Sequence, residues 1–446
     1  METLTDLSRR LAAGDITARA LVEQALERID DPAGEGPRAF MHVSRESARK
    51  QADEIDRRRA AGQRVAPFAG VPAAIKDLFD SAGEVTRAGS RVLNDRPPAA
   101  ADAPAVARLR AAGFIIIGRN TMTEFAYSGL GLNPHYGTPL SPFDRDVRRI
   151  AGGSTSGGAV AVADGMAAAS LGSDTGGSCR IPAAFTGVVG FKPTAHRVPR
   201  EGVVPLSPTL DSVGPLARSV ACCAALDAIL RGTEPQRPAA IDIRELRLLA
   251  PTTLLLDEMQ PEVASAFERA IQRLREAGAS VVEAPLPDLA RIPQVNANGG
   301  IAAAEAYAWH RELLERAGDQ YDPRVAVRIL QGAALTPQDV RAVLEARRQL
   351  IDSIGAQTRS FDAIVAPTTP IIPPPLSAFE SDAEYVRLNA LVLRNPSLAN
   401  FLDGCSISLP IHEPGAPPVG LMLIGEHDAD QRLLAVAAQL EKALEA

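Results

Sequence analysis

Short apolar runs alternate with segments of helical periodicity along most of this chain, and this alternation limits the folds open to it. Residues 70–79, GVPAAIKDLF, are typical of a buried strand, and they precede a helical pattern at 103–113 and a second strand-like run at 114–118. A helix at 260–278 is followed by another strand, and residues 337–370 repeat this plan. Such alternation predicts an α/β fold in which helices cover a sheet.

The chain is longer than one typical domain but shows no sign of division. At 446 residues, it exceeds the usual domain size by about a factor of three. However, we find no internal repeat and no low-complexity linker, so a single α/β body over residues 1–446 fits better than separate domains. Within it, residues 285–360 are expected to form a less regular lobe on the substrate side.

Composition and charge argue against several classes of function. The net charge is −7, whereas nucleic-acid and anionic membrane surfaces need clustered positive charge. No signal-peptide pattern opens the chain, and no apolar run approaches the roughly 18 residues of a membrane span, so we expect a cytoplasmic protein. Cys179, Cys222, Cys223 and Cys405 show no metal-ligand spacing. No metal or cofactor is expected.

Lysine is rare in this chain. It occurs at positions 50, 76, 192 and 442, and all the other basic residues are arginine. Arginine stays protonated at any working pH, whereas a desolvated lysine can become a neutral base. Lys76, at the end of the apolar run VPAAI, is the lysine expected to be desolvated. A lysine beside Asp77 is also typical of a solvated or ion-paired side chain.

Two glycine-rich loops each present a serine. GGSTSGG, at 152–158, and GSDTGGSCR, at 172–180, are separated by a predicted small-residue helix and a strand, which would return Ser178 to the neighbourhood of Ser154. A phosphate-binding loop is disfavoured because no lysine follows the glycines, and a flexible linker is seldom duplicated. The pair is therefore interpreted as a site in which two serines share a proton.

A serine hydroxyl needs a base before it can act as a nucleophile. The six histidines show no triad signature, and no Gly-x-Ser-x-Gly elbow is present. Lysine is the other known partner in serine hydrolysis, which favours Lys76. A lysine of ordinary pKa, about 10.4, is almost fully protonated at neutral pH, so burial would have to lower that pKa by roughly 2–4 units for this role.

These motifs resemble those of the amidase signature family. The two glycine–serine loops and GVPAAIKD match its core pattern, and several flanking pieces match as well: NTMTEFAYSG at 120–129, PAAFTGVVGFKPT at 182–194 and DSVGPLARSV at 211–220. The strong resemblance covers residues 65–225. It implies a large mixed β-sheet core with helices on both faces, and a homodimer is expected by analogy with relatives.

The resemblance also implies a Ser-Ser-Lys triad. Ser178 would be the nucleophile, Ser154 would relay the proton from a position held by a cis peptide bond, and neutral Lys76 would be the base. The oxyanion hole would be formed by the backbone N–H groups of four consecutive residues: Thr175, Gly176, Gly177 and Ser178.

Other positions are given supporting or binding roles. Thr155 stands where the family more often has serine, and Asp174 and Arg180 flank the nucleophile loop, so these three are expected to support the site. The family analogy assigns substrate contact to five residues, although ordinary packing is the alternative for the two aromatic ones: Phe125, Tyr127, Ser128, Gly129 and Gly153.

Two further residues carry weaker expectations. Lys192 is expected to be structural. His196 stands where the family usually has glycine, and two interpretations are open for it. It either tolerates the local backbone as a structural substitute or forms a pocket wall that tunes substrate choice.

The resemblance implies an amidohydrolase that cleaves C–N bonds of small amides or carbamates through an acyl-enzyme intermediate. Urethanes, urea-like compounds and esters are also substrates in this family, and the sequence does not choose among them. One alternative is a component similar to one subunit of an aminoacyl-tRNA amidotransferase, which would need a tRNA-binding partner. A second alternative is a non-catalytic ligand-binding protein that retains the fold.

Overall fold

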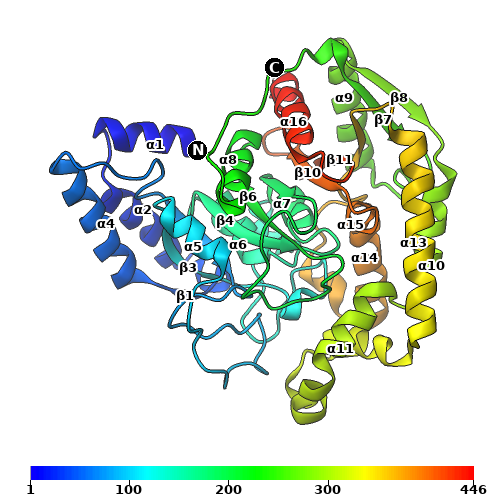
Figure 1. Cartoon of the computed structure of the whole chain (residues 1–446), viewed down its shortest axis with the longest axis horizontal. Helices are drawn as coiled ribbons and strands as arrows, with labels where there is room; N and C mark the ends of the chain where they lie inside the picture. The colour runs from blue at the N-terminus through cyan, green and yellow to red at the C-terminus, as the bar shows by residue number, and fades with distance from the viewer. Residues whose placement is uncertain (1, 446) are drawn as a thin grey trace.

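The computed structural model describes residues 2–445, and a single large β-sheet forms its core (Figure 1). Within that range the sheet has eleven strands, in the order β1-β3-β2-β4-β6-β5-β10-β11-β9-β7-β8. The strands are β1 (Phe40–Val43), β2 (Pro72–Lys76), β3 (Ile115–Asn120), β4 (Ala169–Asp174), β5 (Val189–Lys192), β6 (Ser212–Ala217), β7 (Arg247–Pro251), β8 (Ser280–Ala284), β9 (Ala363–Pro367), β10 (Cys405–Pro410) and β11 (Gly420–Gly425).

The sheet is mixed, as predicted. β2 pairs in parallel with β3 and β4, and β7 pairs in parallel with β8 and β9. The strands between these two groups, together with β1 at the edge, pair antiparallel. The two late strands, β10 and β11, lie side by side within the sheet.

Helices surround this sheet. Figure 1 shows α1, α2 and α4 at the β1 end, and the long α13 at the end that holds β7 and β8. The helices are α1 (Leu4–Ala13), α2 (Ala18–Asp30), α3 (Gly36–Ala39), α4 (Arg45–Ala60), α5 (Pro104–Ala111), α6 (Ser156–Ala163), α7 (Arg180–Thr186), α8 (Val220–Arg231), α9 (Pro261–Glu276), α10 (Ile292–Val295), α11 (Gly300–Ala317), α12 (Pro323–Leu330), α13 (Pro337–Thr358), α14 (Asp382–Arg394), α15 (Ser397–Phe401) and α16 (Asp430–Glu445).

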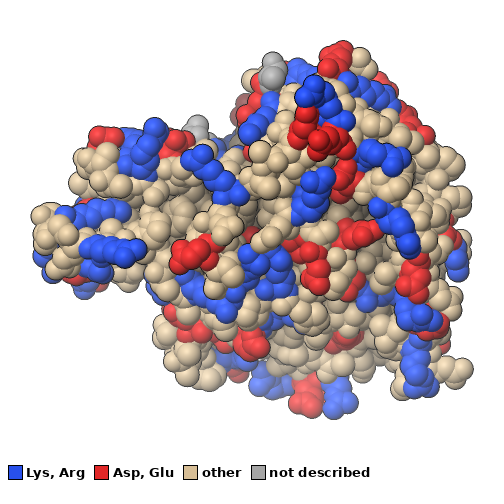
Figure 2. Space-filling view, turned by 45° about the horizontal axis from the view of Figure 1, so that its top comes forward, with Lys and Arg blue, Asp and Glu red and all other residues tan. Residues whose placement is uncertain are grey.

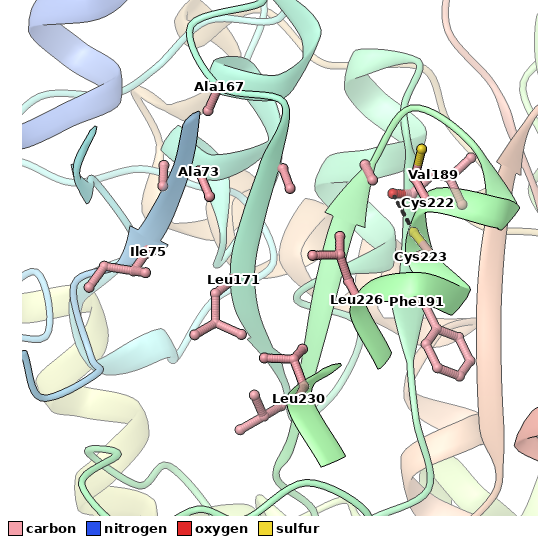
Figure 3. Close-up of a cluster of buried hydrophobic side chains, with 14 of the residues drawn as sticks. Ala73, Ile75, Ala167, Leu171, Val189, Phe191, Cys222, Cys223, Leu226 and Leu230 are labelled. Atoms are coloured by element: carbon pink, nitrogen blue, oxygen red, sulfur yellow. Dashed lines mark hydrogen bonds between the residues drawn. The ribbon is translucent and has the colours of Figure 1, made fainter. Parts of the chain in front are cut away.

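The alternation of residues along β5 shows why both faces of the sheet are covered. Val189 and Phe191 point to one face, where the thiol of Cys223 on α8 donates to the Val189 carbonyl at 3.7 Å (Figure 3). Gly190 points to the other face, where a Cβ would lie 2.7 Å from the Cβ of Ala183 on α7. The missing side chain therefore lets α7 approach the sheet closely.

The local predictions can be compared with these elements. The strands expected within 70–79 and at 114–118 are present as β2 and β3. Residues 285–360, expected to be less regular, are largely helical and contain α10, α11, α12 and α13. Apolar faces that pack on the body explain this, since Ile301 and Val325 are buried.

Composition argued against a membrane span and against a positively charged surface for nucleic acid. The helices and the surface charge are relevant to these two expectations. Among residues 2–445, no helix combines the length and apolarity needed to cross a membrane. On the face shown in Figure 2, positively and negatively charged side chains lie next to one another.

We predict opposite effects for two glycine-to-alanine substitutions. In Gly190→Ala, the new Cβ would collide with the carbonyl oxygen of Cys179, so the variant should lose about 1–3 kcal/mol of stability through overpacking. In Gly355→Ala, on α13, the new methyl group meets nothing within 4 Å, and relief of the glycine penalty should stabilise the protein by about 0.5–1 kcal/mol. Denaturant unfolding of both variants measures this. Equal effects would contradict the proposed close packing of α7.

Candidate active site

The two glycine–serine loops meet where β4 ends. The first loop leads into α6, and the second connects β4 to α7. The N–H of Thr155 donates to the Ser178 carbonyl at 3.2 Å, which joins the loops directly. The peptide bond between Gly153 and Ser154 is cis, the conformation that the family resemblance implied.

Lys76 ends β2 and is fully buried beside these loops. Its Nζ donates to Ser154 Oγ at 2.7 Å and to Ser173 Oγ at 2.9 Å. Within the described part of the chain it forms no ion pair. The neighbouring Asp77 is paired with Arg119 instead, at 2.7 Å. Burial lowers the pKa of Lys76 to about 8. A substantial fraction of this amine is therefore neutral at mildly alkaline pH.

Lys192 provides an internal comparison. Burial lowers its pKa to about 8 as well, but its Nζ donates to the carbonyl oxygens of Pro193 and Gly404 at 2.8 and 2.7 Å. A carbonyl oxygen can only accept a hydrogen bond, whereas a serine hydroxyl can either accept or donate. The surroundings of Lys192 therefore suit a structural ammonium group, and those of Lys76 also suit a neutral amine.

Ser178 lies at a cavity, whereas Ser154 is enclosed. The cavity has a volume of about 660 Å³, and Ser178, Thr175 and Gly176 form part of its wall. Ser154 is 0% exposed and contacts Lys76. Among residues 2–445, no hydrogen bond joins Ser154 Oγ to Ser178 Oγ. The geometry thus supplies the contact between Lys76 and Ser154, and it places Ser178 in the wall of the cavity.

Cys179 follows Ser178 directly but is differently placed. Its side chain is fully buried, and burial raises the pKa of its thiol far above the usual range. A thiol that stays protonated and cannot reach the cavity is no competitor for Ser178 as a nucleophile.

The loop between β4 and α7 leaves three backbone donors unused. The N–H of Gly177, predicted to be an oxyanion donor, is directed at Asp174 Oδ1 at 2.8 Å, which corrects that assignment. For the N–H groups of Thr175, Gly176 and Ser178 the described residues supply no acceptor. These three therefore remain candidates for an oxyanion hole.

Asp174 and Arg180 hold the same loop from behind. Asp174 accepts from the N–H groups of Gly177 and Cys179 and forms an ion pair with Arg180 at 2.8 Å. Burial alone would raise the pKa of Asp174, but the charge and hydrogen bonds of Arg180 hold it well below its usual range. Arg180 also donates to Asn400 Oδ1 at 2.8 Å, so α15 joins this network.

The residues predicted to contact substrate divide into two groups. Tyr127 and Ser128 form part of the cavity wall at Ser178. Gly129 and Gly153 do not, since the Gly153 N–H donates to the Gly129 carbonyl at 2.8 Å inside the protein. Phe125 does not line the cavity either.

The position of Phe125 has a physical reason. Its ring packs against three aromatic rings, with centroid distances of 4.4 to 6.0 Å, contributed by Trp309, His310 and Tyr321. The packing interpretation that the sequence left open is thus the one that the geometry supports for Phe125. This cluster anchors α11 to the body of the protein.

His196 lies away from this cavity. It is exposed, adopts a φ of +67°, and its Nδ1 lies 2.9 Å from a guanidinium nitrogen of Arg200. Histidine is among the residues that tolerate this left-handed region, where glycine is otherwise favoured. The geometry supports the structural interpretation of His196.

Several polar residues at the site were not singled out from the sequence. Ser173, inside the second loop motif, is the second hydroxyl partner of Lys76. Asp211 accepts a hydrogen bond from the Thr175 hydroxyl, and Asn389 accepts from Ser128 Oγ at 2.9 Å. Ser173 and Asp211 lie within quoted motifs, but nothing in a single sequence connects Asn389 to the site.

No metal centre is visible among residues 2–445. Histidine, cysteine and acidic side chains do not gather there in groups of three or more that could hold an ion. The groups that this chain itself brings to the site include the hydroxyls of Ser154, Ser173 and Ser178, a lysine amine and backbone N–H groups.

Comparison with known proteins places this geometry in a family. The amidase family matches residues 20–434. The chain is 35% identical to 2-amino-5-chloromuconic acid deaminase of Comamonas testosteroni, over 98% of this chain and 95% of that protein. It is also 35% identical to a glutamyl-tRNA(Gln) amidotransferase subunit of Roseiflexus sp. (strain RS-1), over 97% and 94% of the two chains.

A solved structure agrees with this match. A crystal structure of an amidase superimposes with a TM-score of 0.89 at 34% identity, covering 99% of each chain. The fold and the site define a hydrolase that acts on carbon–nitrogen bonds. The chain belongs to the amidase family.

We predict that removing one member of the buried ion pair behind the loop destabilises the protein. Asp174→Ala leaves the Arg180 guanidinium buried without its carboxylate, and loss of one member of such a pair costs about 3–5 kcal/mol. The control is Glu345→Ala on α13, which removes an exposed, solvent-screened pair with Arg348 and should change stability little. Urea unfolding measures both variants. A loss in Asp174→Ala no greater than in the control would contradict this role.

Proposed function

We propose that this protein is a stand-alone amidase that uses Ser178 as nucleophile, Ser154 as proton relay and Lys76 as base. The observation that carries the proposal is the buried contact between Lys76 Nζ and Ser154 Oγ, in a loop that is hydrogen-bonded to Ser178, which lines the cavity. The lowered pKa of Lys76 supports it, because a base must be able to lose its proton near the working pH.

In the proposed first half-reaction, Ser178 Oγ attacks the amide carbonyl carbon. The Ser178 proton passes to Ser154, whose own proton passes to Lys76. The N–H groups of Thr175, Gly176 and Ser178 stabilise the negative charge that develops on the carbonyl oxygen. Removal of one such donor typically costs about 2.7–4 kcal/mol of barrier stabilisation.

In the second half-reaction, the proton returns from Lys76 through Ser154 to the leaving nitrogen, and the amine departs. Water then attacks the acyl-enzyme ester and gives up a proton along the same path. The acid is released and Ser178 is restored, so no cofactor is consumed in the cycle.

The substrates that we propose are small amides or carbamates, with urethanes and esters as related carbonyl compounds. The cavity volume of about 660 Å³ suits a small molecule. The relative from Comamonas testosteroni is named for its action on 2-amino-5-chloromuconic acid. A cytoplasmic location and a homodimer stay predictions.

A second candidate is a component of a tRNA amidotransferase, favoured by the 35% identity to the Roseiflexus protein. Such a component would depend on a partner for activity. Purified alone, this chain should hydrolyse amides under our proposal, whereas the alternative requires activity only in the presence of a second, co-purifying protein. The net charge of −7 does not favour direct nucleic-acid binding.

We predict graded losses of amide hydrolysis in three variants. Ser178→Ala should abolish turnover because it removes the nucleophile, and Ser154→Ala and Lys76→Met should each lower kcat by about 10²–10⁴-fold because they interrupt proton transfer. Hydrolysis of an aryl amide, an anilide, an aryl carbamate and an aryl ester measures this. Labelling of Ser178 by a serine-reactive phosphonate separates the enzyme from a non-catalytic binding protein, which would show neither labelling nor turnover.

The pH dependence should report Lys76. Only the neutral amine accepts a proton, and its pKa is about 8, so the rate should rise with pH through that value and level off above it. In Lys76→Met, the residual rate should lose this rise. A profile measured from pH 6 to 10 under single-turnover conditions tests the assignment, and a flat wild-type profile would exclude lysine as the base.

A further inference from the structure

The cavity at Ser178 contains more positive than negative charge. Its wall is largely apolar, with Leu206, Leu391 and Phe401 as examples. The charged residues that line it are three arginines and one glutamate: Arg328, Arg387, Arg394 and Glu258. An arginine beside an apolar wall is incompletely solvated, so its charge favours an anionic partner.

Two of these arginines already have partners in the protein. Arg387 forms a two-point contact with Glu384, at 2.6 and 2.9 Å. Arg394 donates to the Asp257 carbonyl at 2.7 Å and lies 3.7 Å from Glu258. Their donors are thus largely occupied without a ligand.

Arg328 differs from both in having an aromatic residue, Tyr127, as its partner in place of a carboxylate. Its guanidinium carbon lies 4.6 Å from the centroid of the Tyr127 ring, which fixes the group against the cavity wall. In the part of the chain that the structure describes, no carboxylate lies within ion-pair distance of Arg328. Arg324, one turn earlier on α12, is by contrast paired with Asp382 at 2.8 Å.

Arg328 is also positioned relative to the reacting groups. Tyr127, on which it stacks, is followed directly by Ser128, whose hydroxyl is fixed by Asn389 at 2.9 Å, and both residues line the cavity together with Ser178. A substrate bound with its carbonyl at Ser178 therefore shares one cavity with the Arg328 guanidinium.

We propose that Arg328 binds a carboxylate of the substrate, so that the preferred amides are monoamides of dicarboxylic acids. Arginine suits this role because its planar fork binds a carboxylate through two parallel hydrogen bonds. The inference rests on the proposed function of Ser178 and adds the chemical class of the substrate. Hydrolysis of such a compound adds water across the C–N bond and releases the dicarboxylate and ammonia.

The experiment compares a series of dicarboxylic acid monoamides with the neutral amides of the same chain length. The measured quantity is the ratio of kcat/KM for the acidic amide to that for the neutral amide. Wild type should favour the acidic member at one or more chain lengths. Arg328→Met should lower that ratio by about ten- to a hundredfold, and Arg328→Lys should lower it less, because it keeps the charge but loses the two-point contact.

The matched control is Arg324→Met. Arg324 belongs to the same helix as Arg328 but does not line the cavity. Its ratio should equal that of wild type. Because each variant is judged by a ratio, a loss of folded protein does not imitate the expected result. An unchanged ratio in Arg328→Met, or a wild type that prefers neutral amides throughout the series, overturns the proposal.

A binding measurement separates this inference from the catalytic proposal. In Ser178→Ala, calorimetric titration with the preferred acidic monoamide should show binding that weakens at least tenfold when Arg328→Met is added. Binding of this kind without any turnover by wild type would support carboxylate recognition and reject the proposed catalysis. Turnover by wild type, together with equal binding in Ser178→Ala and in the double variant, would support the proposed catalysis and reject carboxylate recognition by Arg328.

Discussion

The buried ion pair between Asp174 and Arg180 is the interaction on which the geometry of the site depends. Asp174 holds the N–H groups of Gly177 and Cys179, and Arg180 reaches Asn400 and the Pro396 carbonyl in a distant part of the chain. A buried ion pair is weak evidence for net stability, because desolvation opposes its Coulomb energy. Its value here is positional, since it fixes which backbone N–H groups are used internally and which stay open at Ser178.

The contrast between the two buried lysines shows that burial alone does not make a base. Both Lys76 and Lys192 have a pKa of about 8 because burial disfavours the charged form. Their acceptors differ, since two carbonyl oxygens hold Lys192 as an ammonium group, whereas Lys76 meets two hydroxyl groups that can reverse their roles. The chemistry of the neighbouring atoms therefore decides which buried lysine can exchange a proton.

Sequence reasoning reached the parts of this site that lie in short motifs, and it failed where partners come from far along the chain. Lys76 and the two serine loops could be located because each motif specifies a strand end or a glycine-rich turn. For Phe125 the sequence left both substrate contact and packing open, because its aromatic partners on α11 cannot be inferred from its own segment. Gly177 was misassigned because the direction of one N–H depends on the side chain of Asp174.

The charge of the cavity could not have been read from the charge of the chain. A net charge of −7 suggests poor attraction for anions, but exposed charges act over only about 10 Å at 0.1 M salt. Arg328 meets a substrate inside the cavity, at hydrogen-bonding range, where the apolar wall limits screening and distant surface carboxylates contribute little. Selection of an anionic substrate therefore depends on which arginine lacks an internal carboxylate, and that property is fixed by side-chain pairing and not by composition.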